Sequence, residues 1–112
     1  MGIFDADVYG PSLPTMVKVE EFGLRAHEED PQRIVPFEFE GVRAMSFGFA
    51  ARGRRAVMRG PMVSQLIGQL VLQTNWGELD YLVIDMPPGT GDIQITLCQE
   101  LPIAAALIVT TP

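Results

Sequence analysis

Residues 80–92 read DYLVIDMPPGTGD, a short apolar run that leads directly into an aspartate and a turn rich in proline and glycine. The continuous apolar stretch at residues 82–84 is typical of a strand covered on both faces, in a parallel sheet with helices on each side. In such sheets, ligands bind outside the carboxyl ends of the strands. We therefore expect Asp85 at a ligand-binding edge, where a hydrated hard cation is the natural partner of a carboxylate.

The turn after this strand has the composition of an anion-binding loop. Pro87 and Pro88 restrict its backbone, while Gly89 and Gly91 allow backbone N–H groups to approach an anion closely. An apolar strand, an aspartate and a glycine-containing turn together describe the Walker B strand and switch loop of a P-loop NTPase. The simpler alternative is an ordinary aspartate that caps the next helix, and the full string DMPPGTGD favours the nucleotide site over it.

A second acidic pair follows a short apolar stretch at the start of the chain. Ile3 and Phe4 are typical of the last residues of a strand, and Asp5 and Asp7 come directly after them. Carboxylates at the ends of neighbouring strands would face the same crevice and serve one metal ion and one attacking water. An Asp-x-Asp pair alone is weak support for such a site.

The rest of the chain predicts alternating strands and helices. Residues 35–46 alternate apolar and polar around Gly41, which indicates two short strands in a hairpin. Pro61 suits the first turn of a helix, and apolar residues at i, i+3, i+4 and i+7 from Val63 predict about four turns, ending near residues 75–77. Residues 93–100 are expected to form a short helix and residues 104–109 another buried strand. This order predicts an α/β fold with a mainly parallel sheet flanked by helices.

Composition limits the classes of function. A chain of 112 residues with 47% hydrophobic content can bury one small core. Its net charge of −6 offers no basic surface for phosphates along a duplex, so we expect no nucleic acid partner. No apolar run approaches the roughly 18 to 20 residues of a membrane span, so none is expected. The cluster of four arginines between Arg52 and Arg59 is interpreted as a solvated loop, with phosphate contact or a subunit interface as the alternative.

Three motifs, in order along the chain, carry a family resemblance. They are DADVYGPSLP at residues 5–14, RGPM at 59–62 and WGELDYLVIDMPPGTGDIQITLCQ at 76–99. With these motifs the chain resembles the Mrp/NBP35-type P-loop ATPases, which act as carriers or scaffolds for iron-sulfur clusters. Within that family it is most similar to the plastid branch of high-chlorophyll-fluorescence scaffolds.

The resemblance implies a role for each acidic residue. Asp7 would orient or activate the water that attacks the γ-phosphate of ATP, and Asp85 would hold Mg²⁺ through its water shell. Pro88 and Gly89 would belong to the second switch, where the N–H of Gly89 contacts the γ-phosphate end. Asp5 would support the first switch.

The resemblance also implies partners. Family members work as homodimers with nucleotide near the interface, and a [4Fe-4S] cluster is held by a Cys-x-x-Cys pair from each subunit. The cluster passes to recipient iron-sulfur apoproteins, and ATP turnover is coupled to its loading or release. The plastid branch implies the chloroplast stroma, with the cytoplasm or the mitochondrial matrix as alternatives.

Two family motifs do not occur in these residues. There is no Gly-Lys-Gly-Gly-x-Gly-Lys-Ser/Thr stretch, which supplies the N–H groups and lysine that hold the β- and γ-phosphates, and no Cys-x-x-Cys. The single cysteine, Cys98, is interpreted as a buried free thiol and not as a cluster ligand. We expect residues 1–112 to be an internal part of one P-loop ATPase domain, from switch I through Walker B and switch II, lacking the Walker A loop and the C-terminal Cys-x-x-Cys. The intact protein is then expected to be an ATPase, and this segment alone to be inactive.

Two other functions remain open for the same residues. One is a positioning ATPase of the MinD or ParA kind, whose nucleotide-gated dimer binds a membrane or DNA. The other is a non-catalytic module that keeps the fold as a dimerisation surface. A dehydrogenase is disfavoured, because GTGD supplies no G-x-G-x-x-G after a strand.

Overall fold

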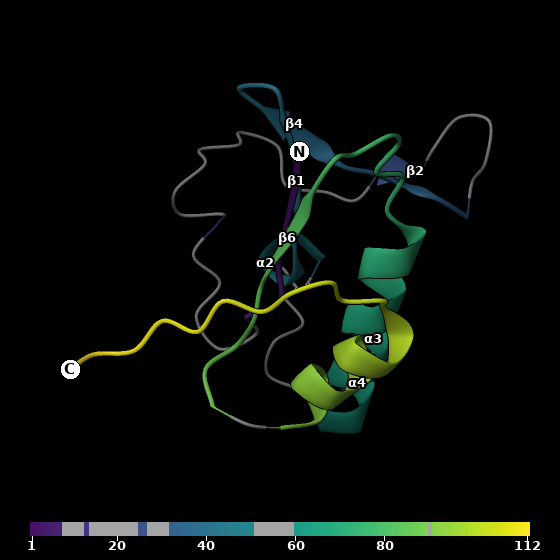
Figure 1. Cartoon of the computed structure of the whole chain (residues 1–112). Coiled ribbons are helices and arrows are strands. Elements are labelled where there is room, and N and C mark those ends of the chain that lie inside the picture. The colour runs from purple at the N-terminus through teal and green to yellow at the C-terminus, as the bar shows by residue number, and fades with distance from the viewer. Residues whose placement is uncertain (8–12, 14–24, 27–31, 51–59, 90) are drawn as a thin grey trace.

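A four-stranded, mostly parallel sheet is the centre of the fold (Figure 1). The computed structural model describes residues 1–7, 13, 25–26, 32–50, 60–89 and 91–112. The strand order is β4-β5-β1-β6, and the strands are β4 (Phe37–Phe39), β5 (Val42–Ser46), β1 (Gly2–Asp5) and β6 (Leu82–Asp85). β5, β1 and β6 are parallel, and β4 is antiparallel to β5. A separate two-stranded antiparallel sheet joins β2 (Arg25–Ala26) to β3 (Ile34–Val35).

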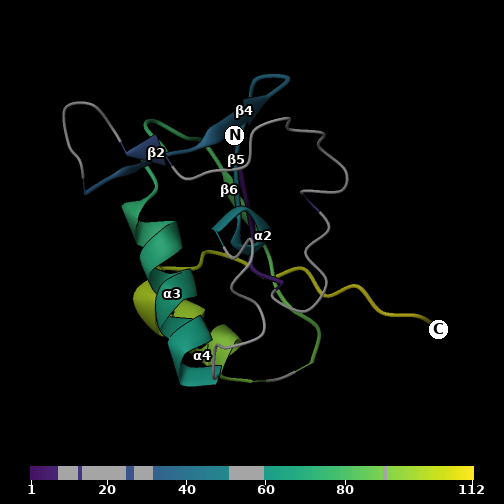
Figure 2. The ribbon, with the colours of Figure 1, turned by 180° about the vertical axis from the view of Figure 1, so that it is seen from behind.

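Two longer helices pack against one another beside this sheet. α3 (Gly60–Gln73) and α4 (Asp92–Glu100) lie next to each other from the front and from behind (Figures 1 and 2), and α2 (Phe47–Ala50) follows β5 directly. At Gly68 a Cβ would lie 3.7 Å from the methyl group of Thr96, an ordinary van der Waals contact, so the two helices touch here without requiring glycine. The parallel strands and flanking helices confirm the predicted α/β class. Among the described residues, no helix combines the length and apolarity needed to cross a bilayer.

The core lies between the sheet and this helix pair. Phe4 and Met45 are paired in register on β1 and β5, and Ile84 of β6 extends the same row. Because residues of one row share a face of a parallel sheet, this row meets the apolar side chains of the helices. The buried apolar cluster consists of Phe4, Ala6, Met45, Phe47, Phe49, Ile67, Leu70, Val71, Ile93 and Leu97.

The helix predicted to begin at Pro61 is present as α3. Its C-terminal end is satisfied locally, since the N–H and the hydroxyl of Thr74 both donate to the carbonyl of Leu70, at 3.1 and 2.5 Å. The N–H of Asn75 then donates to Ile34 O at 2.7 Å, which leads the chain away from the helix axis. Gly77 adopts a positive φ of 66°, the left-handed conformation that glycine permits after a helix.

The hairpin predicted around Gly41 is also present. Phe39 of β4 pairs with Val42 of β5, which leaves a two-residue turn of Glu40 and Gly41. Their φ values are 51° and 81°, and two positive φ angles are the mark of a type I′ turn, whose twist matches that of the strands. Phe37, at the start of the hairpin, packs against Phe49 of α2, with ring centroids 4.4 Å apart and the ring planes tilted by 48°. The hairpin is thereby joined to the core.

The prediction that residues 82–84 are covered on both faces is wrong. Leu82 and Ile84 are half-buried, whereas Val83 is 48% exposed and Asp85 is exposed. β6 is the outermost strand of the described sheet, so its side chains alternate between the core and solvent. A continuous apolar run therefore did not distinguish a strand buried on two faces from one buried on a single face.

The predicted strand at residues 104–109 is wrong as well. The segment after α4 runs extended and leaves the body of the molecule (Figure 1), and Leu107, Ile108 and Val109 are 91%, 86% and 87% exposed. A strand requires backbone partners in a neighbouring strand, and within the described residues the outer edge of β6 does not pair with this segment. High β propensity without a partner is insufficient to form a strand.

Two further predictions concern Cys98 and the arginine cluster. Cys98 is exposed, so the expectation of a buried thiol is wrong. Ile93 and Leu97 are the residues that α4 buries, and the next position is turned by about 100° around a helix of 3.6 residues per turn. The arginine cluster from Arg52 to Arg59 lies outside the described residues.

Candidate functional site: a polar row at the sheet edge

Three adjacent parallel strands end in a polar residue at the same edge of the sheet. In the register of the sheet, Asp5 of β1 is paired on one side with Ser46 of β5 and on the other with Asp85 of β6. Neighbouring strands lie about 4.8 Å apart, and residues of one row share a face. The two acids that the sequence placed at separate strand ends are therefore direct neighbours in the sheet.

Asp5 is buried, and within the described residues it accepts three hydrogen bonds. Its side chain is only 1% exposed. Oδ1 accepts from the N–H of Asp7 at 3.1 Å, and Oδ2 accepts from the N–H of Leu13 at 3.1 Å and the hydroxyl of Ser46 at 3.0 Å. Because a buried carboxylate is costly without donors, these bonds account for its burial. Asp5 thus holds the backbone at Asp7 and Leu13 to the end of the sheet.

Asp85 occupies the same row but is open to solvent. Its carbonyl accepts a hydrogen bond from the N–H of Ala6 at 2.9 Å, which joins β6 to the residue after β1. Partial burial raises the pKa of the Asp85 carboxyl, and the negative charges of Asp5 and Asp7 raise this pKa further. Like charges that raise the pKa of an acid create a site where a cation is favourable.

The turn after β6 is anchored to α4 by a glutamine. Gln94 donates through Nε2 to the carbonyl oxygens of Pro87 and Gly89, both at 3.0 Å. Pro88 and Gly89 are exposed, and Gly89 has a φ of 83°, although a Cβ added to it would meet no atom within 4 Å. Glycine is required there by its backbone conformation and not by crowding. The turn that carries Pro88 and Gly89 is therefore held in a fixed shape beside the acidic row.

The donor set fits a hydrated magnesium ion better than a dehydrated metal. Within the described part of the chain, no group of three or more His, Cys, Asp or Glu side chains is arranged to hold a metal ion. Asp5 is already engaged with three donors, which leaves Asp85 as the exposed carboxylate of the row. Mg²⁺ keeps several waters and is commonly bound by one or two carboxylates together with substrate phosphates. Asp85 fits that requirement.

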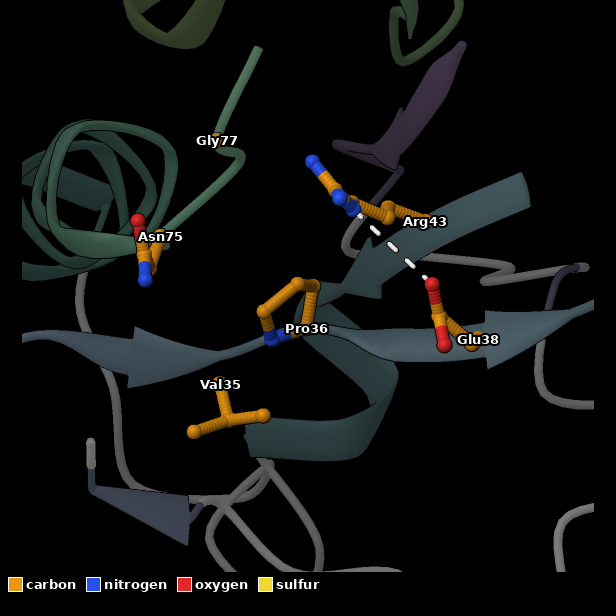
Figure 3. Close-up of a pocket in the computed structure, with 6 residues that line it drawn as sticks. All are labelled: Val35, Pro36, Glu38, Arg43, Asn75 and Gly77. Atoms are coloured by element: carbon orange, nitrogen blue, oxygen red, sulfur yellow. Dashed lines mark ion pairs between the residues drawn. The ribbon is translucent and has the colours of Figure 1, made fainter. Parts of the chain in front are cut away.

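A pocket of about 320 Å³ lies toward the other end of the strands (Figure 3). Arg43, which contributes to it, is level with Gly2 in the sheet, about 10 Å along the strand from Asp5 at 3.3 Å per residue. Its guanidinium donates to the carbonyl of Trp76, and its Nε lies 3.9 Å from Glu38. The charge of Arg43 is thus compensated within the fold. The lining residues are Val35, Pro36, Glu38, Arg43, Asn75 and Gly77.

A known protein family matches the chain that carries this arrangement. The family of NUBPL iron-transfer P-loop NTPases, within the ParA group, matches residues 1–112, which is the whole chain. The chain belongs to this family. The resemblance carried by the three sequence motifs is therefore confirmed, and the α/β fold is the one expected of a P-loop NTPase.

Relatives of this NUBPL-type chain are named as iron-sulfur cluster assembly factors or carriers. The chain is 66% identical to the chloroplastic Fe-S cluster assembly factor HCF101 of Arabidopsis thaliana, and the match covers 100% of the chain and 21% of that protein. It is 54% identical to the iron-sulfur cluster carrier protein of Pseudomonas fragi, covering 100% of the chain and 39% of that protein. The chain thus spans between a fifth and two fifths of the length of these relatives.

A solved member of the same fold is a nucleotide-binding protein from Archaeoglobus fulgidus in complex with ADP. The two structures superimpose with a TM-score of 0.66 at 33% sequence identity, over 88% of this chain and 36% of that one. The fold is therefore shared with a protein that holds an adenine nucleotide.

Two residues of the site were missed by the sequence analysis. Ser46 contributes the third member of the polar row, and Gln94 anchors the second turn. Ser46 directly follows the apolar residues Ala44 and Met45 at the end of its strand, as Asp5 and Asp85 follow apolar residues, and that shared position is the signal that could have identified it. Gln94 carried no comparable signal, because a glutamine on a short helix is usually a solvent-facing residue.

Proposed function

We propose that the protein is an ATP-dependent carrier or scaffold for [4Fe-4S] clusters in iron-sulfur protein assembly. Residues 1–112 would form an internal part of its single P-loop ATPase domain, from switch I through Walker B and switch II. The observation that carries the proposal is the register of Asp5 with Asp85, with Asp7 two residues further along the chain. The names of the relatives and the ADP complex of the structural neighbour support it.

In this proposal each residue of the site has a separate task. Asp85 holds Mg²⁺ through its water shell, and Asp7 orients the water that attacks the γ-phosphate of ATP. Asp5 supports the first switch, since its carboxylate accepts hydrogen bonds from the backbone N–H groups of Asp7 and Leu13. Bound Mg²⁺ would supply charge neutralisation for the phosphates.

The turn beside the acidic row would serve the phosphate end of the nucleotide. Gln94 fixes the carbonyl oxygens of Pro87 and Gly89. With both carbonyl groups held by the helix, Pro88 and Gly89 present a constrained backbone, and the N–H of Gly89 is the group we assign to the γ-phosphate. Such a turn is suited to sense whether that phosphate is present.

The cluster itself is the cargo of the reaction and is held by other residues. The chain contains one cysteine, Cys98, whereas a [4Fe-4S] cluster needs four thiolates. We propose that two copies of the protein form a homodimer with a bridging cluster, and that recipient iron-sulfur apoproteins accept it. The likeness to a chloroplastic assembly factor supports the chloroplast, and we propose the stroma, as the place of action.

The roles of Asp85 and Asp7 can be separated in the full-length protein. Asp85→Ala should raise the Kd for Mg²⁺–ATP by at least about tenfold, because it removes the residue that orients the ion's waters. Asp7→Ala should lower kcat about a hundredfold with a smaller effect on Kd, because it removes the residue that positions the attacking water. Nucleotide titration and phosphate release would measure the two quantities.

Asp80→Ala is the matched control for both substitutions. Asp80 is an exposed aspartate just before β6, at the end of the strand away from the acidic row. Its removal should leave both constants unchanged. Normal hydrolysis by both Asp85→Ala and Asp7→Ala would show that the assigned roles are wrong, and failure to pass a cluster to an apoprotein would contradict the carrier function.

A further inference from the structure

A buried hydrogen-bond chain links the end of β5 to the acidic row. The N–H of Gly48 donates to the hydroxyl of Ser46 at 3.0 Å, and that hydroxyl donates to Oδ2 of Asp5, also at 3.0 Å. Ser46 is completely buried. Ser46 and Asp5 are 41 positions apart in the sequence, so the contact joins separate parts of the chain.

The direction of this chain follows from the chemistry of its members. A serine hydroxyl has one proton to donate, and a carboxylate can only accept. The backbone N–H of Gly48 occupies the acceptor side of the hydroxyl, so the single proton of Ser46 points to Asp5. A buried donor with this orientation fixes the rotation of the Asp5 carboxylate.

The orientation of Asp5 in turn positions the backbone N–H groups of Asp7 and Leu13. Its Oδ1 holds the N–H of Asp7, and its Oδ2, the atom bound by Ser46, also holds the N–H of Leu13. A carboxylate that rotated would lose the alignment of both backbone bonds. The path from Ser46 to Asp7 therefore consists of two consecutive hydrogen bonds.

We propose that Ser46 is a positioning residue, which holds the Asp5 carboxylate so that Asp5 fixes the backbone at Asp7 and Leu13. Ser46 itself touches no reacting atom. Its effect on ATP hydrolysis rests on the proposed function of Asp7, while its effect on the backbone does not. Substitution at Ser46 should consequently act on turnover and not on nucleotide affinity.

The structural part of the proposal is tested by hydrogen exchange in the full-length protein. In Ser46→Ala, peptides that contain the amides of Asp7 and Leu13 should exchange about tenfold faster, because one of the three donors to Asp5 is lost. Ser64→Ala is the matched control. Ser64 is also a buried serine, 6% exposed, but its hydroxyl has no hydrogen-bond partner among the residues that the structure describes. The exchange rate of those peptides should be unchanged in this control.

The kinetic part uses the same variants. Ser46→Ala should lower kcat about tenfold and leave the KM for ATP within about twofold, whereas Ser46→Thr, which keeps the hydroxyl, should restore kcat. Asp5→Asn is a second variant, which disturbs the same hydrogen bonds by changing their acceptor. It should also increase the exchange rate of the peptides that contain Asp7 and Leu13.

Each result decides the proposal. Unchanged exchange in Ser46→Ala, or equally faster exchange in Ser64→Ala, would overturn it. Faster exchange with an unchanged kcat would support the positioning of Asp5 and overturn the effect of Ser46 on turnover, and with it the proposed role of Asp7. If the wild-type protein hydrolyses no ATP, the proposed function fails, and the exchange comparison alone still decides whether Ser46 positions Asp5.

Discussion

Asp85 stands where its own charge is unfavourable. Its carboxyl lies in the same row as Asp5, and its pKa is raised above the ordinary value of 3.8 by partial burial and by the charges of Asp5 and Asp7. A raised pKa means that the folded state disfavours the ionised form relative to the unfolded state. The protonated Asp85 carboxyl therefore makes its full contribution to the free energy of unfolding when the pH is below the ordinary pKa. This contribution is lost as the pH rises through the raised pKa of the folded state.

This sign predicts that Asp85→Asn stabilises the fold at neutral pH. The variant removes the repulsion but keeps the shape of the side chain, so its urea midpoint at pH 7 should exceed that of the wild type. The difference should shrink as the pH falls toward the range where carboxyl groups take up protons, because the wild-type residue then becomes neutral as well. Urea titrations across this pH range would measure it.

Asp80→Asn serves as the control for the neutral pH comparison. Asp80 is exposed and lies outside the acidic row. An equal gain in both variants would show that net charge, and not the neighbourhood of Asp5, is responsible. The expected pattern would show that the ionised carboxylate of Asp85 is unfavourable in this row when no cation is bound.

At the scale of elements, the turn of the β4–β5 hairpin holds a glutamate, Glu40, in a backbone conformation that is unfavourable for that residue. Glu40 has a φ of 51°, in the left-handed region, and Gly41 follows with 81°. Type I′ turns strongly favour asparagine followed by glycine, because a side chain at Cβ crowds the next carbonyl in this conformation. The hairpin therefore forms with the right glycine but with strain at Glu40.

We predict that Glu40→Asn stabilises the chain by about 0.5 kcal/mol and that Gly41→Ala destabilises it by about 1 kcal/mol. Asparagine tolerates the left-handed region, while alanine at Gly41 would be strained even though a Cβ there meets no atom within 4 Å. Thermal unfolding would measure both changes. Glu78→Asn, at an exposed residue without a positive φ, should have little effect, and a gain there equal to that of Glu40→Asn would refute the turn explanation.

At the scale of the whole molecule, apolar residues divide between a closed core and an exposed terminal segment. Leu97 of α4 is completely buried in the cluster beneath the sheet, whereas Leu107, ten positions later, is 91% exposed. The same side chain therefore contributes to stability at one position and not at the other. Burial of apolar area, and not hydrophobicity alone, produces the free energy of folding.

The two leucines predict a clear contrast. Leu97→Ala should lower the unfolding free energy of the chain by about 2 to 5 kcal/mol through lost burial and the cavity that remains. Leu107→Ala should change it by no more than about 0.5 kcal/mol, as expected of an exposed side chain. Urea denaturation of residues 1–112 would compare them. A loss of several kcal/mol in Leu107→Ala would mean that residues 104–109 are packed after all.

Local sequence determined the parts of the protein whose partners are close in the chain. Helix α3 follows from Pro61 and the 3.6-residue spacing after it, and the hairpin follows from alternation around Gly41. The position of Asp85 at the end of an apolar run was also readable, because strand ends are marked by the residues beside them. The family could also be recognised from sequence, because each of its motifs is a continuous stretch of the chain.

Only the tertiary structure decided how these parts meet. Parallel pairing set Asp5 level with both Ser46 and Asp85, and it brought in donors 8 and 41 residues away to satisfy the buried Asp5 carboxylate. It also left residues 104–109 without a strand partner among the described residues, although their sequence favours a strand. Register and pairing depend on residues far apart in the chain, and local patterns hold no information about which of those residues will become neighbours.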